Sequence, residues 1–399
     1  MPLLAQNPKR RVILDWPKTS RRFPSTYHHA NPSWKGLMTF GEDEAAGARI
    51  TSLDEYNKAL DHLQGAGYNE VDTARAYIGG KQEAFTCKAH WKERGLTLAT
   101  KVYPSQPGTH KPDVLTAEFE TSLKELGTDC VDIFYLHAPV GAQNLPSWHR
   151  SNVSLRIARF PLQKPSRQST SFINSEYSAL HERVIANYIY RGKFVKLGLS
   201  NFTAFEVAEV VMHCKYNNWV RPTIYQGMYN AITRNIEQEL IPACKRYGLD
   251  VVIYNPIAGG LFSGKYKTKD IPEEGRFSET SKSGQNYRQR YFRDGMFDAL
   301  AIIEPVVEKH GLRMPEVALR WVVHHSALNI KDGNDGVIVG VSSVDQLDQN
   351  LKDLESGPLP EEVVEALDKA WSVSKGDQPN YWHLALKYTY DTRKALFGV

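Results

Sequence analysis

Four side chains whose types could act together on one small molecule lie at the ends of consecutive predicted strands. Asp72 ends one predicted strand and Tyr77 lies in the loop after it, whereas Lys101 ends the next strand and His137 follows the one after that. The carboxyl ends of parallel strands in a barrel meet at the same rim. We therefore expect these four side chains to lie close together.

The chemistry that suits this set is reduction of a carbonyl. A carbonyl carbon that accepts hydride leaves an alkoxide oxygen, which needs a proton. A tyrosine hydroxyl has a pKa of about 10, and we expect the ammonium group of Lys101 to lower the pKa of Tyr77. Asp72 would hold Lys101 in its charged form, and His137 could orient and polarise the carbonyl. The residues thus predict a small-molecule carbonyl substrate.

Each residue alone also has an ordinary explanation. Asp72 could be a turn or cap residue, and Tyr77 precedes Gly79 in a loop where surface aromatics are common. Lys101 could be solvated, and His137 could serve only the turn that it enters. The interpretation depends on finding all four types at successive strand ends.

The elements that must position these residues alternate between strand-like and helix-like segments. After Ser52, the first of a predicted capping box with Glu55, apolar residues recur at helical spacing. Near-continuous apolar runs predict buried parallel strands. The predicted strands are 37–40, 68–72, 96–101, 131–136, 194–199, 223–226, 250–254 and 336–340.

Eight such strands predict an α/β protein with a (β/α)8 TIM barrel forming a single domain over residues 1–399. The alternative is a doubly wound open sheet. Its dinucleotide-binding form carries a G-x-G-x-x-G motif after the first strand, and that motif is missing here.

Two stretches interrupt the alternation. Residues 15–35 and 140–173 have no apolar periodicity, and the second contains no acidic residue. Loops this long are uncommon inside a compact barrel. We predict that both are weakly ordered surface insertions, and that joining 12–14 to 36–38 would complete the first strand.

The composition excludes several classes of protein. The net charge of +4 over 399 residues gives no reason to expect a nucleic-acid partner. Without an apolar run of membrane-spanning length or a secretory signal, we expect no membrane association and a cytoplasmic location. The four cysteines lie far apart without a C-x-x-C pair, so no metal site is predicted.

Several segments, taken in order, resemble the aldo-keto reductase superfamily. Val71-Asp-Thr-Ala-Arg-Ala-Tyr77 and Phe134-Tyr-Leu-His-Ala-Pro139 resemble its catalytic segments. Three later segments resemble the aflatoxin-aldehyde reductase branch, which includes succinic semialdehyde reductase-like enzymes. They are Leu199-Ser-Asn-Phe202, Tyr254-Asn-Pro-Ile-Ala-Gly-Gly-Leu261 and Val337-Ile-Val-Gly-Val-Ser-Ser343. The resemblance runs from about residue 36 to near the C-terminus, without 140–173.

This resemblance implies NADPH-dependent reduction of aldehydes, with Tyr77 as the proton donor supported by Lys101 and Asp72. The nicotinamide end of NADPH would be held by Met38, Asp72, Ser200, Asn201, Gln226 and Tyr254. The pyrophosphate would be wrapped by Asn255, Pro256, Ile257, Ala258, Gly259, Gly260, Leu261 and Lys265. The adenosine phosphate end would be bound by Arg276, Gly340, Ser342, Ser343, Gln346 and Asn350.

The substrate side would be formed by His137, Tyr287 and Arg290, and an arginine there can clamp a carboxylate such as that of succinic semialdehyde. However, His383 occupies the place of the branch's C-terminal arginine, which weakens the expectation of carboxylate specificity. The resemblance also implies a homodimer. Two alternatives stay open at this point: a cofactor-binding sensor subunit of the same fold, and an inactive paralogue.

Overall fold

The computed structural model describes residues 33–105, 109–110, 112–139, 192–217, 219–281 and 283–383. Within these ranges eight parallel strands form a closed barrel in chain order, so the predicted fold class is confirmed. The strands are β1 (Ser33–Gly36), β2 (Glu70–Asp72), β3 (Thr97–Val102), β4 (Val131–Leu136), β5 (Phe194–Ser200), β6 (Ile224–Met228), β7 (Asp250–Tyr254) and β8 (Gly336–Val339).

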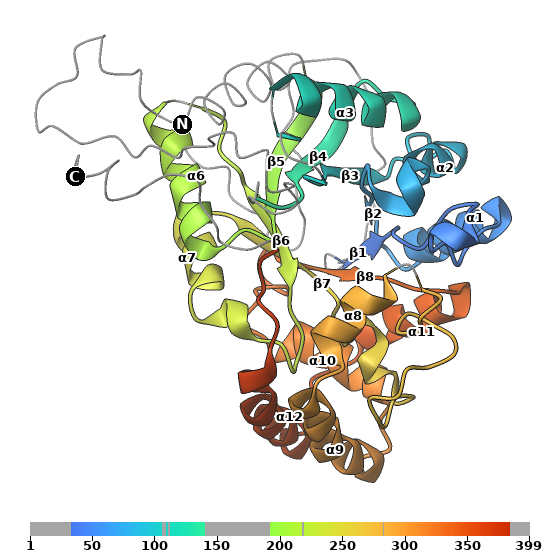
Figure 1. The fold of residues 1–399 in the computed structure, drawn as a ribbon, viewed down its shortest axis with the longest axis vertical. Helices are drawn as coiled ribbons and strands as arrows, with labels where there is room; N and C mark the ends of the chain where they lie inside the picture. Colours follow the sequence, from blue (N-terminus) through green and yellow to red (C-terminus); the bar gives the residue numbers. More distant parts are fainter. Residues whose placement is uncertain are drawn as a thin grey trace, which may run out of the picture.

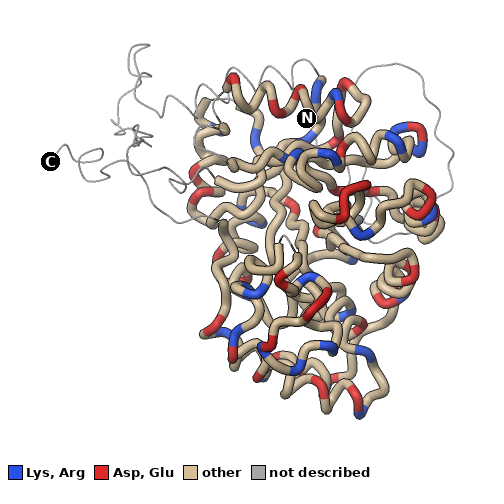
Figure 2. The backbone as a smooth tube through the Cα atoms, turned by 45° about the vertical axis from the view of Figure 1, so that its right-hand side comes forward, with Lys and Arg blue, Asp and Glu red and all other residues tan. Residues whose placement is uncertain are grey.

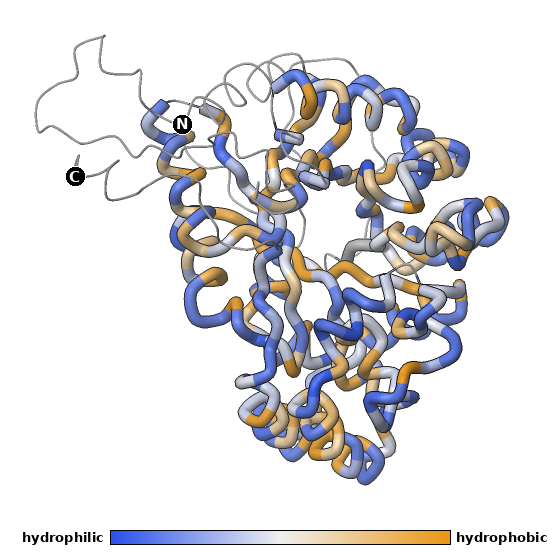
Figure 3. The backbone as a smooth tube through the Cα atoms, in the orientation of Figure 1, coloured by the Kyte–Doolittle hydropathy of each residue, from blue (hydrophilic) through white to orange (hydrophobic). Residues whose placement is uncertain are grey.

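Helices surround these strands (Figure 1). They are α1 (Leu53–Gly65), α2 (Gln82–Lys88), α3 (Pro112–Glu125), α6 (Ala204–Tyr216), α7 (Leu240–Tyr247), α8 (Gly284–Tyr291), α9 (Asp294–Lys309), α10 (Met314–His324), α11 (Val344–Glu355) and α12 (Glu361–Ser374). Charged residues are concentrated on these helices and their connections (Figure 2). Hydrophilic and hydrophobic residues alternate along the helices (Figure 3), as expected for helices that bury one face.

The first strand differs from its prediction. β1 is Ser33–Gly36, whereas Leu37–Phe40 form a turn in which Phe40 N–H donates to the carbonyl of Leu37 at 3.0 Å. The turn is apolar because Leu37 and Phe40 are fully buried, with the ring of Phe40 4.8 Å from that of Tyr56 on α1. A buried turn and a buried strand therefore gave the same apolar signal.

The limits of the predicted insertions change accordingly. Residues 33–35, which were assigned to the insertion 15–35, belong to β1 and pair with β2 and β8. The rest of that insertion, the segment 12–14 and the whole of 140–173 lie outside the described residues. The predicted capping box is also wrong: Ser52 precedes α1 in an extended conformation, but its side chain makes no cap hydrogen bond.

Inside the barrel a small apolar layer lies below the rim. It consists of Ala99, Ile133, Tyr135, Ile224, Val252 and Ile338, which alternate along their strands with residues that pack outward against the helices. Because side chains alternate between the two faces of a strand, the next inward positions on β3 and β6 are Lys101 and Gln226. The barrel interior is thus apolar below and polar at the carboxyl ends of the strands.

None of the helices in the described ranges is both long and apolar enough to cross a bilayer.

The apolar layer gives a test of the barrel packing at Gly198 on β5. A β-carbon at this position would lie 2.2 Å from Cδ1 of Tyr135. We expect Gly198→Ala to displace Tyr135 and to lower the free energy of unfolding by about 1–3 kcal/mol, measured by urea denaturation. The control is Gly65→Ala at the end of α1, where a β-carbon meets nothing within 4 Å. That change should be neutral or slightly stabilising, and equal effects of the two would contradict the packing described.

Candidate active site

A buried ion pair lies at the centre of the barrel rim. Lys101 Nζ is 2.6 Å from Asp72 Oδ2 and donates a second hydrogen bond to the carbonyl of Thr73 at 2.7 Å. The other oxygen of Asp72 accepts from Gln226 Nε2 at 3.0 Å. Burial raises the pKa of Asp72 and lowers that of Lys101, and their mutual attraction opposes both shifts. Side chains from β2, β3 and β6 are therefore tied together without access to water.

Tyr77 lies beside this pair in the loop after β2. Lys101 Nζ is 5.3 Å from the centre of the Tyr77 ring. Burial, followed by the charge of Asp72, raises the pKa of Tyr77 well above its usual value. The expected lowering of the pKa by Lys101 is therefore wrong for this structure, because burial disfavours the phenolate and Asp72 balances the ammonium charge. Tyr77 keeps its proton, which suits a proton donor.

The loop that carries Tyr77 is held by residues that the sequence analysis did not single out. Arg75 binds both the carboxylate of Glu83 on α2 and the carbonyl of Gly80. Glu83 is fully buried and also accepts from Thr100 Oγ1 at 2.6 Å. A buried charge needs such partners. The ion pair between Arg75 and Glu83 thus connects the two ends of the loop that carries Tyr77. No local sequence pattern indicates this ion pair.

His137 faces Tyr77 from the end of β4. The two ring centroids are 6.1 Å apart at 79°, and Tyr103 contacts the His137 ring edge-on at 5.2 Å. Burial, Lys101 and His383 lower the pKa of His137 well below its usual value, so the imidazole is neutral near pH 7. Its Nδ1 atom is buried and has no hydrogen-bond partner among the described residues. The buried Nδ1 cannot meet a ligand, but a neutral imidazole has a second ring nitrogen, which can make a hydrogen bond to a polar atom of a ligand.

The loop after β5 joins the predicted cofactor residues to the predicted catalytic ones. Asn201 has a φ of 61°, and its Nδ2 donates to the carbonyl of His137 at 2.8 Å and to Ser200 Oγ at 3.0 Å. The hydroxyl of Tyr254 donates to Asn201 Oδ1 at 2.7 Å. Ser200, Asn201 and Tyr254 therefore lie together beside His137. Met38 follows β1 and packs, partly buried, against the core.

The loop after β7 has an unusual backbone. Asn255 and Ala258 have φ values of 57° and 49°, and both Gly259 and Gly260 also lie in the left-handed region. A β-carbon at Gly259 would lie 2.6 Å from Tyr287, so the loop packs tightly against α8. Among the other predicted residues of this loop, some are buried and some are accessible: Pro256 and Leu261 are buried, Ile257 is half-buried and Lys265 is exposed.

Two arginines flank Tyr287. Arg276 Nη1 donates to the hydroxyl of Tyr287 at 2.9 Å, and its guanidinium lies 4.9 Å from the ring centre. Arg290 lies 5.9 Å from the same ring centre. Neither guanidinium makes an ion pair with a carboxylate in the described part of the chain. Both are therefore available to an anionic ligand.

The segment after β8 begins helix α11. Ser343 caps the helix by accepting from the N–H of Gln346 at 3.2 Å, and Ser342 donates its N–H and hydroxyl to Gln346 Oε1 at 3.0 Å each. Gly340 has open space where a side chain would be, whereas Asn350 is nearly buried on the helix. Ser343 caps the helix, and the first amide groups of the helix could also meet an anion.

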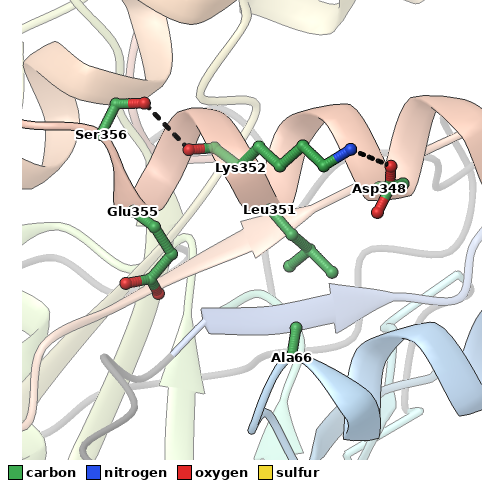
Figure 4. Close-up of a pocket in the computed structure, with 6 residues that line it drawn as sticks. All are labelled: Ala66, Asp348, Leu351, Lys352, Glu355 and Ser356. Atoms are coloured by element: carbon green, nitrogen blue, oxygen red, sulfur yellow. Dashed lines mark hydrogen bonds and ion pairs between the residues drawn. The ribbon is translucent and has the colours of Figure 1, made fainter.

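A shallow hollow lies away from this rim (Figure 4). It is lined by Ala66, Asp348, Leu351, Lys352, Glu355 and Ser356, near the C-terminal ends of α1 and α11. The helices of a (β/α)8 barrel run opposite to its strands, so this hollow is at the other end of the barrel. It contains none of the residues described above.

Comparisons with known proteins agree with this geometry. A model of the aldo/keto reductase family matches residues 34–372. An aldo-keto reductase of Pseudocercospora fijiensis is 38% identical over 329 residues, which are 81% of this chain and 99% of the relative. Aflatoxin B1 aldehyde reductase member 2 of Homo sapiens is 38% identical over 327 residues, which are 79% of this chain and 81% of the relative.

A crystal structure of an aldo-keto reductase from Klebsiella pneumoniae in complex with NADPH aligns with a TM-score of 0.56 at 22% identity. The alignment covers 86% of this chain and 91% of that chain. At this level of identity the likeness concerns the fold.

The buried ion pair can be tested by a double-mutant cycle. Asp72→Asn removes the negative partner of a buried ammonium group, and we expect it to lower the free energy of unfolding by about 3–5 kcal/mol. Adding Lys101→Met should restore part of that loss, because no unpaired charge is then buried. Urea denaturation of both single variants and the double variant measures the interaction energy. Strictly additive effects would show that the two side chains do not depend on each other.

Proposed function

The chain belongs to the aldo/keto reductase family, and on that premise we propose that it is an NADPH-dependent aldehyde reductase in which Tyr77 donates the proton. The observation that carries this proposal is the position of Tyr77 beside the buried pair of Lys101 and Asp72 and beside the ring of His137. These residues come from separate strand ends, where TIM-barrel enzymes place their active sites.

The residues predicted to hold NADPH suit a long anionic dinucleotide. The loop after β7 has left-handed backbone at Gly259 and Gly260, which lets a ligand approach the main chain closely. Lys265 is exposed, and Arg276 makes no ion pair among the described residues. When bound, NADPH would supply the hydride. Ser200, Asn201 and Tyr254 would face its nicotinamide end, and the N-terminus of α11 would face its adenosine phosphates.

The protein side chains would then control the carbonyl oxygen. The hydroxyl of Tyr77 would donate its proton to that oxygen as negative charge develops there. His137, being neutral, would orient the oxygen by a hydrogen bond and would not compete with Tyr77 as the acid. The ion pair of Lys101 and Asp72 would keep both groups in place, since it contacts Tyr77 and is held by three strands.

The substrate side contains Arg290 and aromatic rings. Tyr103 and His137 would face an aromatic or aliphatic aldehyde, and Arg290 offers a positive charge without a carboxylate partner in the described ranges. We therefore propose semialdehydes and aromatic aldehydes that carry a carboxylate as substrates. A homodimer and a cytoplasmic location stay predictions of the sequence.

The proposal is tested by NADPH oxidation with 2-nitrobenzaldehyde and succinic semialdehyde, beside a Tyr77→Phe variant. We expect the variant to lose about 10²–10⁴-fold in kcat, because only the proton donor is removed, while NADPH binding measured by fluorescence persists. NADPH binding without turnover by the unaltered protein would instead favour a sensor subunit or an inactive paralogue. Full activity of Tyr77→Phe would remove Tyr77 from its proposed role.

The raised pKa of Tyr77 predicts a pH profile. Because the pKa of Tyr77 is raised well above its usual value, the acid form of Tyr77 persists throughout the neutral range, and because the pKa of His137 is lowered, its imidazole is neutral over the same range. We expect kcat/KM for aldehyde reduction to be nearly constant between about pH 6 and pH 9. An inflection near neutral pH that disappears in Tyr77→Phe would contradict this.

A further inference from the structure

His383 lies beside the candidate active site. Its backbone N–H donates to the carbonyl of Asn201 at 3.2 Å, which ties this segment to the loop after β5. Its Nε2 atom lies 2.8 Å from Arg290 Nη2 and 3.3 Å from the hydroxyl of Tyr254. Its ring meets that of Tyr103 at 6.2 Å. The side chain therefore contacts residues on both the cofactor and the substrate sides.

The partner atoms determine the chemical form of His383. A guanidinium can only donate hydrogen bonds, so Nε2 must accept from Arg290 and the ring proton must be on Nδ1. Burial, followed by the charge of Arg290, lowers the pKa of His383 to about 3. His383 is thus a neutral acceptor at physiological pH and adds no charge to the site.

Arg290 is consequently held in position but is not neutralised. Burial opposes its charge, yet the surrounding tyrosines, Tyr254 first among them, raise the pKa of Arg290. One N–H of Nη2 is directed to His383, while the other donors of the guanidinium have no carboxylate partner in the described residues. Lys101 is balanced by Asp72, whereas Arg290 is a positive charge beside Tyr254 and His383 without a carboxylate partner in the described part of the chain.

We propose that His383 is a specificity-determining residue, which orients the guanidinium of Arg290 to bind one carboxylate group on the aldehyde substrate. The inference rests on the proposed function and extends it to a residue outside the four-residue catalytic set. His383 acts through Arg290 and is a positioning residue. A fixed guanidinium loses less conformational freedom when it binds a carboxylate than a mobile one does.

The experiment compares two substrates that differ only in charge: 4-carboxybenzaldehyde and its methyl ester, methyl 4-formylbenzoate. The measured quantity is the ratio of their kcat/KM values, which cancels any general loss of activity. We expect His383→Leu, which lacks an acceptor, to lower the carboxylate-to-ester ratio about tenfold. His383→Gln keeps a neutral acceptor and should stay within about threefold of the unaltered protein.

Two further variants complete the design. Arg290→Met should lower the ratio at least as far as His383→Leu, and His62→Leu, on α1 away from the site, should leave it unchanged. A ratio that falls in Arg290→Met but not in His383→Leu would overturn the inference, because Arg290 would then bind the carboxylate without help. Equal losses in His383→Leu and His383→Gln would also overturn it, because the acceptor would have no part.

Failure of the proposed function would give a different result from failure of the inference about His383. If the unaltered protein reduces neither aldehyde, the reductase proposal fails, and the inference is then tested on binding alone. Dissociation constants of the two compounds, measured by quenching of tryptophan fluorescence, should give the same loss of carboxylate preference in His383→Leu. An unchanged preference in that measurement would overturn the role of His383 independently.

Discussion

Lys101 and Asp72 carry opposite charges inside the barrel, where they are almost inaccessible to water. Removing two charges from water is costly, and their attraction offsets the cost only if the remaining hydrogen-bonding groups also find partners. The carbonyl of Thr73 and the amide of Gln226 supply these partners. The pair thereby links β2, β3 and β6 at the rim, and Tyr77 lies beside it. Asp72, Lys101 and Gln226 can therefore form a polar layer at the carboxyl ends of the strands, because each of these buried groups finds its hydrogen-bond partners inside the barrel.

The loops above this pair store backbone strain. Ile78, Asn201, Asn255 and Ala258 all have left-handed φ angles although none is glycine, and each follows the carboxyl end of a strand. Such conformations persist only where the surrounding contacts hold them. Asn201 is held by hydrogen bonds to the carbonyl of His137 and from the hydroxyl of Tyr254. Among the described residues, His90 after α2 is the one non-glycine residue with a positive φ that lies away from the segments that would meet the cofactor and the substrate.

The sequence predicted most of what depends on local pattern. The strands 131–136 and 250–254 have the predicted bounds, because their apolar runs are bounded by polar or turn residues. The positions of Tyr77 and His137 at one rim followed from the strand order alone. The first strand was wrong because the buried turn after Gly36 is as apolar as a strand. The direction of the pKa shift of Tyr77 was wrong because it depends on burial and on the sharing of one ammonium group, which are properties of the assembled barrel.

Barrel closure joins segments that are far apart in the chain. The short strand β1 pairs with β8, and the hydroxyl of Thr39 donates to the carbonyl of Val341 across 302 positions at 2.8 Å. The entropy of closing so long a loop must be compensated before these contacts form. We therefore expect β8 to complete the ring late in folding. Gly340, Ser342 and Ser343, which the proposed cofactor site needs, directly follow β8 in the chain. A nascent chain on the ribosome would thus have no competent site until β8 has emerged.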